Sequence, residues 1–430
     1  MAASGPDVHR AIEAVFRIES ARLIAGLTRI VRDVGVAEEL AQDALVAALA
    51  QWPESGVPDN PGAWLMGTAK HRAVDHVRRD RVGARKVEEL GHATEVGAAA
   101  TRVEDDMADA LDDDVGDDLL RLVFISCHPV LVTEARVALT LRLLGGLTTD
   151  EIARAFLVAE PTVAQRIVRA KRTLSEAQVP FELPRGPERA ARLASVLEVI
   201  YLIFNEGYSA TAGDDWMRPG LCEDALRLAR ILCGLAPGEP EAHGLCALLE
   251  LQASRAGARV GPDGAPILLL EQNRARWDQL LIRRGLAALQ RAEQLGGAAG
   301  PYALQAAIAA CHARARRAAD TDWARIAALY AVLAGVLPSP VVELNRAVAV
   351  GMAEGPAAGL ALADALTEAP ALADYHLLHA VRGDLLAKLA RYDEARVALE
   401  RAAGLTRNAR ERELLLERAA SCAAGVAPRR

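Results

Sequence analysis

The chain is predicted to be all-α, and three observations favour this fold class. Alanine, leucine and arginine dominate the composition, and all three are good helix formers. Aromatic residues make up only 4% of the chain, and β-branched runs with a period of two are hard to find. Apolar residues recur at helical spacing along much of the sequence. With 430 residues, 52% of them hydrophobic, the chain should form about two to four domains with substantial cores.

The first helical module is predicted over residues 8–82. A helix from about 36 to 52 is amphipathic. Its polar face carries Glu39, Gln42, Asp43 and Val46, and its apolar face carries Leu40, Ala41, Leu45, Ala48, Leu49 and Trp52. Turn-forming residues are dense from Pro53 to Gly62, which predicts a loop. The next helix, from Trp64 to Val82, is rich in basic side chains: Lys70, His71, Arg72, Arg78, Arg79 and Arg81.

Residues 83–116 are predicted to form an acidic linker. Between residues 83 and 118 there are twelve acidic and three basic side chains. The simpler interpretation is a soluble tether. An alternative hypothesis is that its negative charge folds back on a basic helix and suppresses DNA binding by the free protein; deletion of residues 95–114 would test it.

A second module, over residues 117–178, is predicted to end in a helix-turn-helix. Thr148 and Glu151 have the spacing of a capping box, which begins a helix that runs to about Phe156. After a short turn, Pro161 lies where a helix start tolerates proline. The second helix has an apolar stripe formed by Val163, Ile167, Ala170 and Leu174. Its other face carries Thr162, Gln165, Arg166, Arg169 and Arg172.

These two faces favour a helix that lies in the major groove of DNA, since an apolar back packs on the module while donors face the bases. The alternative is an amphipathic helix on the surface of a bundle. The whole-chain net charge of −7 does not exclude a nucleic-acid binder, because the acidic linker hides local basic clusters.

Residues 188–424 are predicted to be a succession of helices separated by Gly/Pro breaks. The clearest repeat spans residues 376–409, where Gly383, Ala395, Leu399 and Ala402 have the spacing of a tetratricopeptide repeat (TPR). Arg407 lies where that repeat usually ends in proline, and earlier segments fit it less well. A solenoid of helical pairs is therefore the expected architecture of this half.

Several classes of protein are not expected. The six scattered cysteines predict buried free thiols in a reducing compartment. No signal peptide and no run of about 18 apolar residues is present, so we expect a soluble, cytoplasmic protein without a membrane partner. Nucleotide-binding and nucleophile-elbow motifs are absent, and we expect no catalytic residue, metal or cofactor.

On these motifs, the chain resembles the sigma-70 family of transcription initiation factors, specifically the extracytoplasmic-function (ECF) type. Residues 8–82 and 117–176 resemble regions 2 and 4 of that family. The segment VAEELAQDALVAAL (36–49) is similar to the helix that docks on the clamp coiled coil of RNA polymerase. The resemblance implies that this interface with core polymerase uses Glu38, Glu39, Gln42 and Asp43.

The same resemblance implies two DNA interfaces. WLMGTAKHRAVDHVRR (64–79) resembles the segment that melts and reads the −10 element, and VAEPTVAQRIVRAKRTL (158–174) resembles the −35 recognition helix. The residues assigned to the −10 element are Asn60, Trp64, Lys70, His71, Arg72, Arg78 and Arg79. Those assigned to the −35 element are Thr162, Gln165, Arg166, Arg169, Lys171 and Arg172.

Three departures from the family pattern affect these interfaces. His71 stands where asparagine is commoner, Leu157 stands where the turn usually has glycine, and Pro161 stands where glycine is usual just before Thr162. Trp64 fits a stacking platform for a base, but core packing is the more ordinary role for it. Asp75 is expected to pair with Arg72, Arg78 or Arg79 rather than to contact DNA.

The C-terminal half resembles the TPR-like extension of one ECF subgroup, through segments such as residues 192–210 and 339–350. The implied partners are core RNA polymerase, through its clamp coiled coil and flap, and promoter DNA. The extension would contact a protein partner or the chain's own DNA-binding modules.

Two rival hypotheses remain open at this stage. A conventional helix-turn-helix regulator with a TPR-like sensor would bind an operator tightly without polymerase. An enzyme fused to a DNA-binding head would need clustered acid–base or metal residues. His376 and His379, and the polar segment Asn205–Tyr208 with Asp214 and Asp215, are weak signals of this kind.

Overall fold

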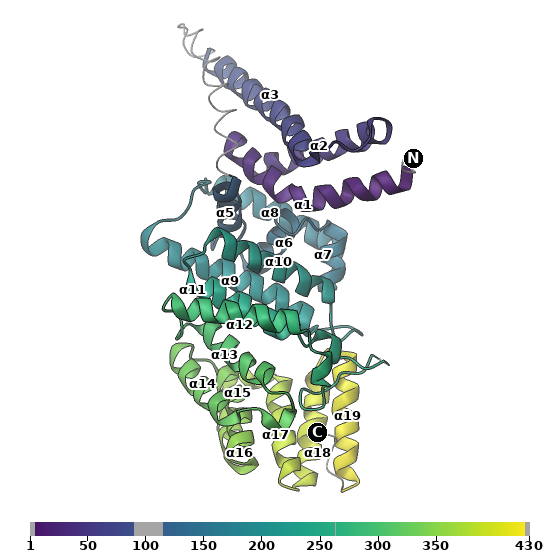
Figure 1. The fold of residues 1–430 in the computed structure, drawn as a ribbon, viewed down its shortest axis with the longest axis vertical. Coiled ribbons are helices and arrows are strands. Elements are labelled where there is room, and N and C mark those ends of the chain that lie inside the picture. Colours follow the sequence, from purple (N-terminus) through teal and green to yellow (C-terminus); the bar gives the residue numbers. More distant parts are fainter. Residues whose placement is uncertain (1–4, 90–114, 263, 426–430) are drawn as a thin grey trace. The chain divides into compact units, whose positions relative to one another are not determined.

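The computed structural model describes residues 5–89, 115–262 and 264–425 (Figure 1). These residues form helices and loops but no β-strand, and two isolated bridges pair Gly213 with Asn408 and Val260 with Pro266. The all-α prediction is therefore confirmed. The helices divide into two compact units, Met1–Val199 and Ile200–Arg430.

The first unit begins with three helices: α1 (Gly5–Val31), α2 (Val34–Ser55) and α3 (Pro61–Glu89). They pack around Trp52 and Leu65, whose side chains are buried. The polar residue that precedes α2 explains where that helix begins. Asp33 accepts hydrogen bonds from the backbone N–H groups of Gly35 (2.7 Å) and Val36 (3.0 Å), which would otherwise lack partners in the first turn.

The predicted loop from Pro53 to Gly62 is wrong at both ends. Helix α2 continues through Pro53 to Ser55, and Gly56, with a φ of 82°, ends it. Helix α3 begins at Pro61, where proline loses no intrahelical hydrogen bond. Asn60 caps α3, because its Oδ1 accepts from the backbone N–H of Ala63 at 3.1 Å. Turn-forming residues thus mark the helix ends here as well as the loop.

The next helices are α5 (Val115–Ser126), α6 (Thr133–Leu143), α7 (Thr149–Phe156) and α8 (Glu160–Glu176). Helix α5 packs on α1, and α6 packs on α8. Helices α7 and α8 form the predicted helix-turn-helix. The acidic linker falls mostly outside the described residues, and so do the residues of its proposed deletion.

Helix α9 (Gly186–Tyr208) joins the two units of the chain. Within the first unit, Ser195 Oγ donates to the carbonyl of Cys127 (2.6 Å) and Arg192 Nη2 donates to that of Phe124 (3.1 Å). The first part of α9 is therefore fastened to the end of α5. The predicted start of the C-terminal extension, residue 188, lies in the first turn of this helix.

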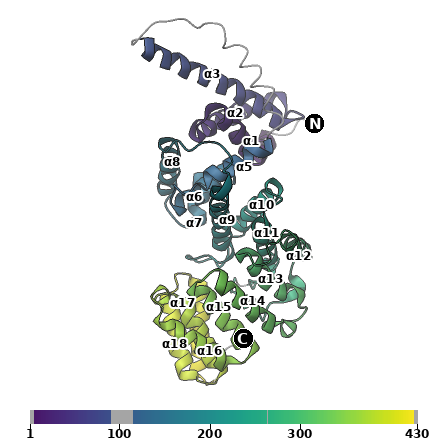
Figure 2. The ribbon, with the colours of Figure 1, turned by 90° about the vertical axis from the view of Figure 1, so that its left-hand side faces the viewer.

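The second unit contains ten further α-helices among the described residues: α10 (Pro219–Leu235), α11 (Pro240–Ala253), α12 (Gln279–Gln294), α13 (Pro301–Arg314), α14 (Trp323–Val336), α15 (Pro340–Ala353), α16 (Pro356–Ala365), α17 (His376–Lys388), α18 (Tyr392–Leu405) and α19 (Ala409–Ala423). From α13 onward each helix packs on the next, and Figure 2 shows α16, α17 and α18 side by side. The predicted succession of helices in this half is confirmed.

The contact between α17 and α18 explains the repeat-like spacing in the sequence. A Cβ added at Gly383 would lie 2.7 Å from Cγ of Leu399, so only glycine allows the two helices to approach this closely. Ala395, Leu399 and Ala402 are fully buried on the facing helix. The small residues of this pattern thus allow the two helices to pack closely.

The ends of the second unit are tied together by one buried amide. Asn408, which is 1% exposed, donates from Nδ2 to the carbonyls of Ala210 (3.1 Å) and Asp215 (3.0 Å). Its Oδ1 caps α19 by accepting from the backbone N–H of Glu411. The loop after α9 is therefore held by the start of the last helix.

Candidate nucleic-acid and polymerase interfaces

Helix α8 has the two faces that its sequence predicts. Val163, Ile167, Ala170 and Leu174 are buried, which fixes the helix on its module. On the other face Thr162, Gln165, Arg169 and Arg172 are exposed, and Arg166 is half-buried. Arg172 donates to Glu176 at 2.6 Å, an exposed contact along the helix. The face presents hydrogen-bond donors of the kind that read or flank base edges in a major groove.

The capping box that begins α7 is confirmed. Thr148 Oγ1 accepts from the backbone N–H of Glu151 at 3.1 Å, and Glu151 Oε2 accepts from that of Thr148 at 2.7 Å. Pro161 lies in the first turn of α8, where it was expected.

Between α7 and α8, Leu157 adopts a left-handed conformation with a φ of 50°. The backbone N–H of Leu157 bonds to the carbonyl of Arg154, and that of Val158 bonds to the carbonyl of Ala153. A left-handed residue at a helix end suits glycine, because a side chain there meets its own backbone. The turn therefore has helix-turn-helix geometry despite its leucine.

Helix α3 carries the basic residues predicted for the −10 element. His71, Arg78 and Arg79 are exposed, and Lys70 is half-buried. Arg72 forms an ion pair with Asp43 of α2 at 3.0 Å, so one predicted DNA residue meets one predicted polymerase residue. Asp75 has a different contact from the one expected, because Arg79 bonds to its backbone carbonyl at 3.2 Å rather than to its carboxylate.

Trp64 packs edge-to-face on Trp52, with ring centroids 5.3 Å apart and an interplanar angle of 69°. Trp52 is fully buried, whereas Trp64 is half-buried. This contact favours the core-packing role that the sequence also suggested. The partly exposed indole remains available at the surface beside Asn60 of the preceding loop.

Helix α2 separates the four predicted polymerase-binding residues into two groups. Glu39 and Asp43 are exposed, and Gln42 is half-buried. Glu38 is only 4% exposed and accepts hydrogen bonds from Arg142 Nε at 2.6 Å and Gln42 Nε2 at 2.9 Å. Its second carboxylate oxygen forms an ion pair with Lys171 of α8. Glu38 thus lies at a contact between the two modules.

A second buried carboxylate also joins these modules, and sequence reasoning missed it. Asp118 of α5 is 2% exposed and pairs with Arg29 of α1 at 3.3 Å and with Arg121 at 2.5 Å. From sequence, Asp118 was counted with the acidic linker. Its position directly before the apolar run that begins at Leu119 was the available signal that it belongs to the folded part. Arg142 was missed as well, because nothing near it in sequence marks it as a partner of Glu38.

Comparison with known families and proteins bears directly on these two modules. Residues 16–82 match "Sigma-70 region 2", and residues 121–174 match "Sigma-70, region 4". The ECF RNA polymerase sigma factor SigK of Mycobacterium ulcerans (strain Agy99) is 30% identical over 166 residues, which are 37% of this chain and 82% of SigK. The chain belongs to the sigma-70 family of RNA polymerase sigma factors.

Further similarities cover other parts of the chain, and one of them covers most of it. An uncharacterized protein of Rhizobium meliloti (strain 1021), R00370, is 46% identical over 390 residues, or 90% of each chain. Probable ECF RNA polymerase sigma factor SigI of Mycobacterium tuberculosis (strain H37Rv) is 24% identical over 188 residues, or 44% of this chain and 62% of SigI. Residues 192–293 match a family of unknown function, DUF6596. No solved structure matches the chain.

The matched ranges contain every residue that was assigned to an interface. The predicted polymerase and −10 residues fall within the region 2 match, and the predicted −35 residues fall within the region 4 match. As a sigma factor, the protein acts in transcription initiation with core RNA polymerase and promoter DNA. The role of each individual side chain stays a prediction.

The weaker sequence signals in the second unit have structural partners. His376 Nε2 lies 3.0 Å from Glu411, and within the described ranges no three His, Cys, Asp or Glu side chains gather as metal ligands. Glu206 pairs with Arg218 and accepts from Thr211 Oγ1 at 2.9 Å. None of the helices that the structure describes is long and apolar enough to cross a membrane.

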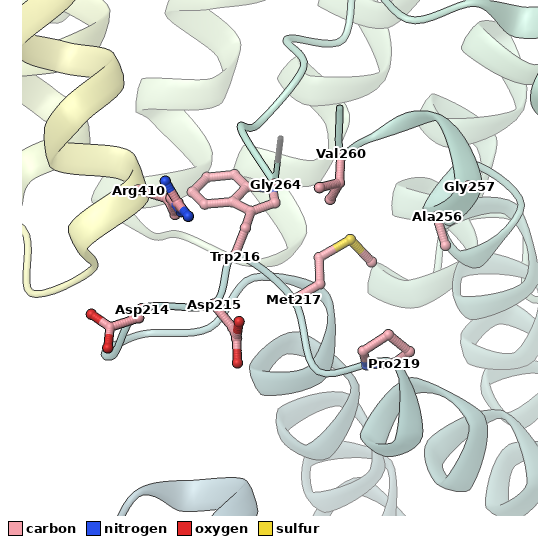
Figure 3. A pocket seen from close by; sticks show the side chains of 10 residues that line it. All are labelled: Asp214, Asp215, Trp216, Met217, Pro219, Ala256, Gly257, Val260, Gly264 and Arg410. Carbon is pink, nitrogen blue, oxygen red and sulfur yellow. The ribbon is translucent and has the colours of Figure 1, made fainter. Parts of the chain in front are cut away.

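Asp214 and Asp215 do line a hollow, of about 490 Å³ (Figure 3). The loop that carries both aspartates forms one side of it, and Arg410 of α19 lies on another. Trp216 and Met217 line the hollow between these two sides. Both aspartates are exposed, so their carboxylates keep contact with water.

Proposed function

We propose that this sigma factor is of the ECF type, binds core RNA polymerase, recognises the −35 and −10 elements, and promotes DNA melting. It would work in the cytoplasm and do no chemistry itself. The observation that carries the proposal is the pairing of two basic helix faces, on α3 and α8, with two separate sigma-type modules. A conventional regulator would need only the second module, which contains α8.

At the −35 element, Arg166 and Arg169 would donate to guanine and Gln165 to adenine, each pair contributing about 1–3 kcal/mol of discrimination. Thr162, Lys171 and Arg172 would contact the sugar–phosphate backbone and so position the helix. The exposed placement of Gln165 and Arg169, opposite the buried stripe, supports this division.

At the −10 element, Lys70, His71, Arg72, Arg78 and Arg79 would line a basic track for the melted strand. Asn60 and the partly exposed edge of Trp64 lie at the start of the same helix, where an extruded base could be held. Capture of such a base favours the open strand, and stacking on an aromatic ring contributes about 1–3 kcal/mol.

The polymerase interface would use Glu39 and Asp43, with Gln42 and Glu38, against the clamp coiled coil; region 4 would reach the flap. Exposed acidic side chains speed encounter with a basic partner and set its register. The C-terminal half would be a TPR-like regulatory or interaction domain, a proposal supported by its close-packed helical pairs.

The contact between Lys171 and Glu38 limits which promoter elements the two modules can bind at the same time in this arrangement. The −35 and −10 elements lie about 25 base pairs apart, or roughly 85 Å of duplex at 3.4 Å per base pair. Helix α2 contacts both the predicted −10 helix, α3, and the predicted −35 helix, α8, so the two DNA-binding helices lie too close together for elements at that separation in this arrangement. We therefore propose that the described arrangement is a closed state of the free protein, which opens on polymerase.

Binding measurements with and without core enzyme test the proposed function. The full-length protein should bind core polymerase, bind promoter duplex weakly alone, and bind it tightly as holoenzyme. Asp43→Ala should weaken core binding, whereas Gln51→Ala, an exposed change on α2 outside the predicted polymerase-binding segment, should not. Tight operator-like binding by the free protein, with no affinity for core enzyme, would support the conventional regulator instead.

A further inference from the structure

The second unit encloses a cavity of about 260 Å³ that the proposed function does not use. Five helices contribute to its wall: the end of α9, then α11, α13, α14 and α15. Its volume is close to the lower limit of typical small-molecule sites. Its lining combines apolar side chains such as Leu248 and Ile308 with tyrosines and several amides.

The cavity holds one charged side chain without a counter-ion. Arg255 lies just after α11 and is half-buried. It bonds to Gln252 Oε1, and its guanidinium lies 5.7 Å from the ring centroid of Tyr208 and 5.9 Å from that of Trp277. It forms no ion pair with any residue that the structure describes, and no acidic side chain lines the cavity. A partly desolvated cation whose contacts are an amide and two aromatic rings, and which has no carboxylate beside it in the described part of the chain, favours an anion as its missing partner.

The neighbouring arginine has a different role, because both of its terminal nitrogens, Nη1 and Nη2, already donate to the protein. Arg274 is 8% exposed and bonds to the carbonyls of His312 (2.7 Å) and Ala315 (2.8 Å) and to Thr321 Oγ1 (3.0 Å). It therefore fixes the wall of the cavity and adds positive potential. Arg255 is left as the side chain that can turn to a ligand.

His312 adds a polar atom that has no partner in the protein. Its side chain lines the cavity, is 8% exposed, and has an Nδ1 without a hydrogen-bond partner. Burial, with Arg255 and Arg274 nearby, lowers the pKa of His312 to about 3, so the imidazole is neutral at physiological pH. Edge-to-face packing on Trp323, with centroids 5.1 Å apart, holds the ring in place. A neutral imidazole can bond to a ligand without opposing an anion.

We propose that this cavity binds a small organic carboxylate with a planar, apolar body. The carboxylate would pair with Arg255, and the amides of Gln305 and Asn345 would complete its hydrogen bonds. The body of the ligand would lie among Tyr201, Tyr330 and Ile308. A single cation suits one carboxylate, and the size of the cavity suits a ligand of about one ring. Binding at this cavity would be independent of the role of the DNA-binding modules.

Titration calorimetry on the full-length protein tests the proposal with four probes: benzoate, 4-hydroxybenzoate, phenylacetate and indole-3-acetate. At least one should bind in the millimolar range or tighter at one site, and its neutral amide should bind about tenfold or more weakly. Absence of saturable binding by all four, or equal binding of acid and amide, would overturn the proposal.

Matched variants locate the site. Arg255→Gln should weaken the binding of the probe about tenfold or more, whereas Arg283→Gln, an exposed change on α12, should not. Ala309→Leu, which fills the cavity and leaves Arg255 in place, should also weaken it. The rise in melting temperature with ligand, measured for each variant against its own ligand-free form, separates lost binding from a folding defect. Undiminished binding by both Arg255→Gln and Ala309→Leu would place the site elsewhere and contradict the assignment.

Discussion

Glu38 and Lys171 form an ion pair, although they belong to helices predicted to bind different partners. Glu38 lies in the predicted polymerase-binding segment, and Lys171 lies on the predicted −35 recognition helix. Arg142 binds the same carboxylate at 2.6 Å, so one buried acid pairs with two basic groups of region 4. The predicted segments for polymerase binding and for −35 recognition are thereby linked through a single side chain.

Glu38→Gln should loosen this contact. We expect the free protein to bind promoter duplex several-fold more tightly, because Lys171 is released for phosphate. Its stability should fall by about 2 kcal/mol, the cost of losing charged hydrogen bonds in a buried site. Fluorescence anisotropy and urea unfolding measure the two effects. Glu39→Gln removes the same charge from an exposed neighbour, and equal behaviour of the two variants would argue against a closed state.

Arg169 and Arg172 lie on one face of α8 but should differ in role. Arg169→Ala should cost about 1–3 kcal/mol at the preferred −35 sequence and relax the choice of one base. Arg172→Ala should weaken DNA binding by a similar factor for all promoter sequences. The slope of log affinity against log salt concentration should fall by the amount expected for about one lost phosphate contact. Holoenzyme binding to a panel of single-base promoter variants at several salt concentrations distinguishes them. If only the Arg172 variant lost its preference for one base, Arg172 would be the base-reading residue and the two predicted roles would be reversed.

Leu157→Gly should stabilise the helix-turn-helix or leave its stability unchanged. Glycine relieves the left-handed strain at φ 50°, a gain of about 1 kcal/mol, which its greater freedom in the unfolded chain partly offsets. Leu157 is 55% exposed, so little packing is lost. Thermal unfolding measures the change. Leu157→Ala is the control, since it removes the side chain but keeps the strain; if the alanine variant matches the glycine variant, strain is not the cause.

Helix boundaries and faces of α7 and α8 could be predicted because local rules determine them. The capping box, the proline of the first turn and the four-residue apolar stripe all act within a few residues of one another. The error at Pro53–Gly62 has a local cause too, since proline and asparagine both break and begin helices. Sequence patterns alone do not distinguish these two uses.

Long-range partners could not be predicted in the same way. Glu38 lies 104 positions from Arg142 in the chain, and no periodic pattern relates them. Asn408 lies 198 positions from Ala210, whose carbonyl it binds. The cavity of the second unit was likewise not foreseen, because its wall is assembled from five helices whose side chains look individually ordinary. Such sites depend on how separate helices pack together. The spacing of residues within one helix does not predict that packing.

Acidic pH should destabilise the second unit through His312. Its folded pKa, about 3, lies below the ordinary value of 6.5, so the unfolded chain binds the proton more readily. The contribution of His312 to the free energy of unfolding is therefore fully present above about pH 6.5. It is lost as the pH drops toward 3, by at most about 1.4 kcal/mol per pH unit. Urea unfolding at pH 7 and pH 5 should show a smaller difference for His312→Phe than for the wild type. His71→Asn, an exposed change, should keep the wild-type difference.

Run-off transcription with purified bacterial core polymerase and a library of promoter fragments tests the central claim most directly. The full-length protein should direct specific transcripts, and Asp43→Ala and Arg166→Ala should each abolish or strongly reduce them, while Gln51→Ala should not. The selected fragments should share two elements about 25 base pairs apart, roughly 85 Å of duplex. Absence of specific transcripts and of core binding, together with tight and specific binding to duplex DNA alone, would contradict the account.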